Sequence, residues 1–222
     1  MKRKAGLVAV LVIGGIVLFL ACAPGPEMYH VSLKYDPGIG KAVGQVAGEK
    51  KVVVTMFRDV RSVDDPVKMG WVTHPGGKKL WVMPVKEYPD VAVTEVVSEY
   101  LRHQGYRVEA HHPLWDLKDE TIDAGLGDIL VGGTIEELEV TCDNADRFSP
   151  VKKYTARVRI KFVIADGKNR RVVFKTETEA TSSLKDVSFS TEKLERQLND
   201  ALAEVMEKAF SGKEMVRILR NL

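Results

Sequence analysis

The chain has 222 residues, with 33 Lys and Arg against 31 Asp and Glu, and a formal net charge of +2. Residues 1–21 hold three of the basic residues and none of the acidic ones, so the remaining 201 residues hold 30 basic and 31 acidic side chains. This balance of charges offers no bulk electrostatic attraction for nucleic acid. A chain of about 200 residues can bury one good hydrophobic core or two small ones.

The N-terminus combines a basic segment, residues 2–4, with an apolar run over residues 5–21. The small residue Ala21 ends this run, and Pro24 shortly after it prevents a helix from continuing. This order is typical of a secretory signal that is cleaved after Ala21. The run also comes close to the roughly 17–25 residues of a bilayer span, so an uncleaved membrane anchor and a cleaved soluble protein stay open as alternatives.

Residues 18–22, Leu-Phe-Leu-Ala-Cys, resemble the lipobox of bacterial lipoproteins. That family has Leu three residues before the Cys and a small residue two before it. Ala21 and Cys22 match the family pattern, whereas Phe19 and Leu20 depart from it. The resemblance implies that Cys22 becomes the first residue of the mature chain and carries diacylglycerol and an acyl chain. We expect no other cofactor.

The same resemblance implies a location and a set of domain boundaries. Ala23, and not Asp, follows the cysteine. By the sorting rule of enteric bacteria, this residue implies the outer membrane, with the protein on its periplasmic face. Residues 1–21 are then the signal peptide, residues 22–28 a lipidated tether to the membrane, and residues 29–222 a single α+β domain.

Beyond the tether, hydrophobic periodicity predicts both strands and helices. The expected elements are, in chain order, strands at 29–35 and 51–57, a hairpin at 69–85, a helix at 90–104, a strand at 106–110, a long strand at 129–142, paired strands at 155–164 and 172–180, a helix at 191–210 and a short tail helix at 215–222. Residues 36–50 and 111–126 are expected to be connections.

Both long helices carry one apolar stripe at helical spacing. The two stripes consist of Val93, Val96, Val97, Tyr100 and Leu101 in the first helix and of Leu194, Leu198, Leu202, Val205, Met206 and Phe210 in the second. Stripes of this kind are buried by packing against a sheet. We therefore expect an α+β fold in which two amphipathic helices pack on one face of a mostly antiparallel sheet.

The long strand and the hairpin that follows it give two further signals. Gly132 and Gly133 interrupt the long strand and predict a bulge or a bend there. In the hairpin, whose turn is at Asp166 and Gly167, the outward-facing residues are basic on one strand and acidic on the other. We expect these charges to form cross-strand ion pairs on a solvated face.

Trp71 and Trp81 flank the glycine-rich turn of the hairpin at 69–85. Tryptophan is enriched at protein interfaces, so these two rings are the candidate contact for a partner. The competing interpretation is that the rings pair across the hairpin and pack on the core.

The residue patterns of catalytic and metal sites are missing. The sequence contains no G-x-S-x-G, H-E-x-x-H, C-x-x-C or Walker motif, and the glycines of residues 38–44 do not have the dinucleotide-binding spacing. His103, His111 and His112 are expected at the surface and not around a metal ion. Cys142 alternates with apolar residues, which favours a buried, inert thiol over a reactive thiol or an intermolecular disulfide. We therefore expect no catalytic and no metal-binding residue.

Three stretches together carry a family resemblance. Residues 53–61 are a buried strand that ends in Asp59-x-Arg61, residues 96–108 are a helix that ends in LRHQGYRV, and residues 127–135 lead into the long strand. This order resembles the YajG-type lipoproteins and is similar to the auxiliary lipoproteins of ABC-type lipid transport systems, whose fold is like the TolB amino-terminal domain. The resemblance covers most of the mature chain and implies no catalytic residue. Asp59 and Arg61 are expected to brace a strand end.

Three functions follow from these observations. We favour a non-enzymatic envelope lipoprotein, anchored through Cys22, that acts as an accessory or adaptor and docks another envelope component. The alternative is a lipid or lipopolysaccharide transport auxiliary that binds an apolar ligand between the helices and the sheet. The third is an enzyme, which would need a buried titratable pair in a cleft.

Overall fold

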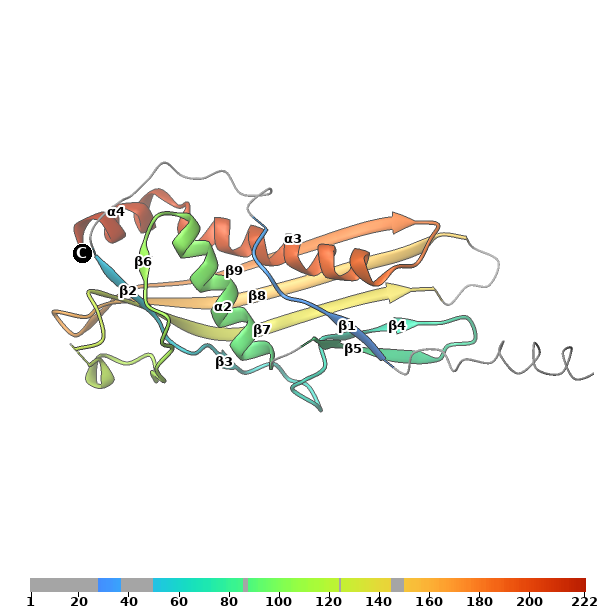
Figure 1. Cartoon of the computed structure of the whole chain (residues 1–222), viewed down its shortest axis with the longest axis horizontal. Coiled ribbons are helices and arrows are strands. Elements are labelled where there is room, and N and C mark those ends of the chain that lie inside the picture. Colours follow the sequence, from blue (N-terminus) through green and yellow to red (C-terminus); the bar gives the residue numbers. More distant parts are fainter. Residues whose placement is uncertain (1–27, 37–49, 86–87, 124, 145–149) are drawn as a thin grey trace, which may run out of the picture.

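A computed structural model of the protein describes residues 28–36, 50–85, 88–123, 125–144 and 150–222. Its centre is a sheet whose longest strands are β7 (Ile129–Asp143), β8 (Lys152–Asp166) and β9 (Arg171–Asp186), joined by antiparallel pairing along almost their whole length (Figure 1). These are the residues whose apolar and polar side chains alternate, which fits a sheet with one buried face.

Three short strands follow one another along the free edge of β7, all parallel to it. They are β2 (Lys51–Val54), β3 (Arg58–Asp59) and β4 (Gly70–Thr73). The sheet continues from β4 through β5 (Lys79–Pro84), which is antiparallel to β4, to β1 (Met28–Val31), which is parallel to β5. At the other end, β6 (Arg107–Val108) pairs with β2.

The helices α2 (Pro89–His103), α3 (Thr191–Phe210) and α4 (Lys213–Asn221) lie on one face of this sheet (Figure 1). Both predicted apolar stripes are buried in a single core with the sheet. Aromatic rings connect the layers: Phe210 of α3 lies 5.5 Å from Tyr100 of α2 and 5.2 Å from Phe162 of β8, between ring centroids. The predicted α+β class, with amphipathic helices packed on one face of the sheet, is confirmed.

The opposite face of the sheet carries a second, smaller hydrophobic cluster near the start of β7. Trp115 and Ile122, from the connection that also contains the 3-10 helix η1 (Asp119–Thr121), pack on Leu130, Val163 and Ala165. The sequence predicted the connection but not its packing, because it has no regular periodicity. The connection covers β-strand residues that would otherwise expose apolar side chains to water.

Two predictions about the strands were wrong in detail. The first strand ends at Val31 and not at residue 35, because Ser32 and Lys34 donate their backbone N–H groups to Glu195 and Asn199 of α3 instead of to a strand. The second strand, expected at 51–57 and described as one buried strand over 53–61, is divided: β2 ends at Val54, and β3 is a separate two-residue strand.

The predicted bulge at Gly132 and Gly133 lies elsewhere. Both glycines pair regularly with β8, and the pairing is irregular between Ile135 and Glu137 instead. A Cβ atom at Gly133 would lie 2.1 Å from the carbonyl oxygen of Lys161. The glycine is therefore needed for close packing of two strands, not for a bend.

None of the helices among the described residues is long and apolar enough to cross a bilayer. The predicted signal peptide at residues 1–21, its predicted cleavage site at Ala21, the predicted lipid attachment site Cys22 and the glycine-rich loop at 38–44 lie outside the described residues.

Candidate functional site

Trp71 and Trp81 stand directly opposite each other in the β4–β5 pair. Their ring centroids are 6.5 Å apart and the rings meet edge to face, at 83°. The neighbouring residues Val72, Leu80 and Val82 point into the core and are buried. The rings therefore pair across the hairpin, as one interpretation predicted, but they do not pack on the core: they lie on the face away from the helices, and Trp81 is 39% exposed.

Each tryptophan ring has a lysine ammonium group over it. The Nζ atom of Lys68 lies 4.2 Å from the centroid of Trp81, and that of Lys79 lies 4.3 Å from the centroid of Trp71. Contacts of this kind contribute about 0.5–1 kcal/mol at exposed sites. They fix the rings on the outer face. The ammonium group of Lys68 also pairs with the carboxylates of Asp64 and Asp65, at 3.1 and 3.8 Å.

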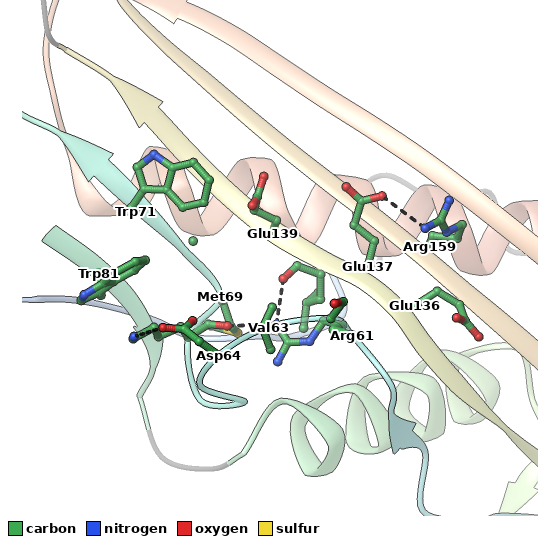
Figure 2. A pocket seen from close by; sticks show the side chains of 14 residues that line it. Arg61, Val63, Asp64, Met69, Trp71, Trp81, Glu136, Glu137, Glu139 and Arg159 are labelled. Atoms are coloured by element: carbon green, nitrogen blue, oxygen red, sulfur yellow. Dashed lines mark hydrogen bonds and ion pairs between the residues drawn. The ribbon is translucent and has the colours of Figure 1, made fainter. Parts of the chain in front are cut away.

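A cleft of about 500 Å³ opens between this hairpin and strand β7 (Figure 2). It exists because the chain leaves the edge of β7 after β3 and returns at β4. Val60 still donates to the carbonyl of Ile135, and Val140 donates to the carbonyl of Met69, but residues 136–139 lie between these two contacts and line the cleft.

Arg61 holds the segment that leaves the edge of β7. All five N–H donors of its guanidinium have acceptors: both carboxylate oxygens of Asp59, and the carbonyl oxygens of Pro66, Lys68 and Leu138, at 2.6–3.0 Å. The side chain is 3% exposed. The expected bracing role of Asp59 and Arg61 is thus present, and it also shapes the cleft, because the guanidinium binds a β7 carbonyl in place of a neighbouring strand.

Charged side chains from β7 and β8 line the other side of the cleft. Glu137 and Glu139 project from the same face of β7, and Arg159 lies beside Glu137, 4.0 Å away (Figure 2). Partial burial raises the pKa of the Glu139 carboxyl above its ordinary value, which Arg157, 3.6 Å away, opposes. The predicted ion pairs of the hairpin are present as well: Lys161 of β8 lies 3.6 Å from Glu177 of β9.

Of the other predicted residues, His112 differs most from expectation. Its side chain is only 9% exposed, and its ring nitrogens lie 2.9 Å from the carbonyl oxygen of Val54 and from a carboxylate oxygen of Glu95. It connects β2 to α2 and is not a surface residue. His111 is exposed, as predicted.

Cys142 is fully buried in β7, and burial raises the pKa of its thiol to about 11. Because the thiolate is the nucleophilic form, such a thiol is unreactive near neutral pH. Over the described ranges of the chain, His, Cys, Asp and Glu side chains form no group of three or more that could hold a metal ion.

Sequence analysis missed the cleft itself. Its lining comes from three separate stretches, residues 61–71, Trp81 and residues 136–139, together with Arg159 of β8. The sequence gave two signals at this place, and neither predicted a cleft: Trp71 and Trp81 were expected as a partner contact, and Asp59 and Arg61 as the brace of a strand end.

Comparison with known proteins shows resemblance in fold. No model of a known protein family matches the chain, and no curated protein matches its sequence. Among solved structures, the protein XCC0632 from Xanthomonas campestris, of family DUF330, has a TM-score of 0.50 and 14% sequence identity, with 87% of this chain and 98% of that chain covered.

Two other solved structures are less similar. PelC from Paraburkholderia phytofirmans, solved as a dodecamer, has a TM-score of 0.41 at 14% identity and covers 75% of this chain and 89% of its own. The lipoprotein GNA1162 from Neisseria meningitidis has a TM-score of 0.27 at 11% identity, with coverages of 78% and 99%. The similarity to XCC0632 supports the α+β fold. At 14% identity, it shows the fold alone.

Proposed function

We propose that the protein is a non-enzymatic envelope lipoprotein, anchored through Cys22, and that it docks a second envelope component through the cleft face. One structural observation carries this proposal. Two tryptophan rings lie on the outer face of the sheet, at the wall of a cleft whose shape is held by the buried guanidinium of Arg61. Preformed concave surfaces with aromatic anchors are typical of docking sites.

The N-terminal sequence supports the lipid anchor. The basic segment, the apolar run and the Ala21-Cys22 pair support cleavage and lipidation at Cys22, with the outer membrane as the location that Ala23 implies. Two or more acyl chains on one residue give stable membrane attachment, whereas one chain gives only marginal binding. The resemblance to YajG-type and ABC-transport auxiliary lipoproteins is part of the same proposal.

The alternative, an apolar ligand between helices and sheet, is less well supported. The apolar faces of the helices are packed with the sheet in one core. The cavity lined by Tyr100, Phe210 and Leu219 lies between the helices α2, α3 and α4 and has a volume of about 20 Å³. Such a volume has room for about one water molecule and not for an acyl chain. A lipid ligand would require the helices to move away from the sheet.

The proposed lipid anchor predicts the mass of the N-terminal peptide. We expect the N-terminal peptide of membrane-extracted protein to begin at Cys22 and to carry the mass of diacylglycerol and an acyl chain. Cys22→Ala removes that mass because it removes the only sulfur that can carry the thioether there. Cys142→Ala, the matched control, keeps it. A wild-type peptide that begins at Met1 contradicts the lipid anchor and indicates an uncleaved membrane span.

The docking role predicts a position-specific crosslink in intact cells. Ser62 is exposed and lines the cleft. Ser183, on β9, is also exposed but does not line the cleft. A photoreactive p-benzoylphenylalanine placed at Ser62 is expected to give a discrete crosslinked protein band. The same group at Ser183 is expected to give none. Equal crosslinking from both positions, or none from Ser62, contradicts a protein partner in the cleft.

A further inference from the structure

One row of apolar side chains crosses three strands on the outer face. Met28 of β1 is the register partner of Trp81 in β5, and Trp81 is the register partner of Trp71 in β4. Tyr29 and Val82, which follow Met28 and Trp81 in the chain, point into the core and are buried. Because side chains alternate along a strand, Met28, Trp81 and Trp71 all project from the opposite face.

Two of the three side chains in this row are exposed, and the third, Trp71, is half-buried. Met28 is 40% exposed and Trp81 39%, and Val63, which lines the cleft with Trp81, is 45% exposed. Single exposed apolar residues are ordinary, but neighbouring ones mark a contact surface. Large apolar residues in register on adjacent strands form one continuous strip.

The length of the tether sets where this strip lies relative to the anchor. Met28 is the sixth residue after Cys22. A fully extended chain of that length spans at most about 20 Å. Adjacent strands are about 4.8 Å apart, so the backbone at Trp81 lies within about 25 Å of Cys22 whatever path the tether takes. Trp81 is on the strand that pairs directly with β1, and Trp71 is one strand further from the tether.

The chemistry of the strip matches the headgroup region of a bilayer. Tryptophan is enriched at both membrane–water interfaces, where its ring is in the apolar boundary and its N–H in the polar one. Lysine near an interface buries its stem along apolar surface and keeps its ammonium group among the headgroups. Lys79, over the ring of Trp71, provides one such ammonium group, whereas that of Lys68, over Trp81, also pairs with Asp64 and Asp65, at 3.1 and 3.8 Å.

We propose that Met28, Trp81 and Trp71 rest in the headgroup region of the bilayer that holds Cys22. This inference rests on the proposed lipid anchor, and it names the bilayer as the component that the tryptophans contact. The charged side of the cleft, with Glu137, Glu139 and Arg159, is left for a protein partner. A strip beside the tether holds the domain in one orientation, so that the cleft always opens at the membrane surface.

Tryptophan fluorescence tests the contact directly, because the described chain offers its own control. The third tryptophan, Trp115, is 5% exposed and packs in the small cluster near the start of β7, away from the β4–β5 hairpin. The lipidated full-length mature protein is reconstituted in vesicles of phosphatidylethanolamine and phosphatidylglycerol, with or without brominated phosphatidylcholine as quencher. The matched variant carries both Trp71→Phe and Trp81→Phe and retains Trp115.

We expect brominated lipid to quench the wild-type protein and to leave the double variant unquenched. The two single variants are each expected to lose part of the quenching. Wild-type protein that floats with the vesicles but is not quenched overturns the membrane contact and leaves the lipid anchor intact. Equal quenching of the wild type and the double variant also overturns it, because the quenched residue would then be Trp115. Failure of both proteins to float with the vesicles contradicts the anchor, and the contact with it.

Discussion

Replacement of Arg61 by alanine is expected to lower the free energy of unfolding by about 3–5 kcal/mol, the usual effect of removing one partner of a buried ion pair. The guanidinium is 3% exposed and satisfies the carboxylate of Asp59 and three carbonyl groups at once. Alanine leaves that carboxylate, 14% exposed, without its cation. The carbonyl of Leu138 also loses its hydrogen-bond donor, and a buried unpaired group of this kind is costly.

Urea unfolding of Arg61→Ala and of Arg157→Ala provides the measurement and its control. Arg157 also faces a carboxylate, that of Glu139 at 3.6 Å, but it is 54% exposed. Exposed pairs contribute about 0–1 kcal/mol, so this variant is expected to unfold close to the wild type. A loss below about 1 kcal/mol for Arg61→Ala would show that the segment over the cleft does not depend on the guanidinium. Crosslinking from Ser62 is expected to weaken in the same variant, because the cleft loses its brace.

Replacement of Gly70 by alanine is the second large effect that we expect. Gly70 begins β4 with a φ of +136°, and an added Cβ atom would lie 1.8 Å from the carbonyl oxygen of Val140 in β7. The backbone conformation alone costs about 1–3 kcal/mol for a residue with a side chain. The overlap forces β4 and β7 apart at a further cost of about 1–3 kcal/mol. The expected total is therefore about 2–6 kcal/mol.

The matched control is Gly77→Ala in the turn between β4 and β5. Gly77 also has a positive φ, +84°, but no atom lies within 4 Å of an added Cβ. This variant is therefore expected to lose only the conformational part, about 1–2 kcal/mol. Thermal or urea unfolding compares the two variants. If both lose the same amount, the close approach of β4 to β7 is not what Gly70 provides.

The long elements were predictable because each of them buries a single face. The helix expected at 191–210 is found as α3 (Thr191–Phe210), with Ser190 as its cap accepting a hydrogen bond from the backbone N–H of Lys193. The long strands β7 and β8 extend only a little beyond their predicted bounds. Periodicity over many residues averages out local exceptions, so it locates such elements well.

Short elements were not predictable, because their partners decide them. The segment after Val31 has the alternation of a strand, yet side chains of α3 accept its N–H groups. In β3, Arg58 and Asp59 are strand residues only because they lie beside Thr134 and Ile135 of β7. Neither outcome is encoded in a window of a few residues.

The sequence by itself determined the alternation of the hairpin, the two helical stripes and the chemical features of the N-terminus on which the proposed anchor depends. Only the tertiary structure decided which way the hairpin faces. Trp71 and Val72 are adjacent and both apolar, as are Trp81 and Val82, so alternation separates the two sets without saying which one is inside. The valines are the inner set: Val72 and Val82 are 0% exposed and pack against the other buried side chains of the core. The larger indole rings remain on the outer face, at the wall of a cleft that forms only when residues far apart in the chain meet along β7.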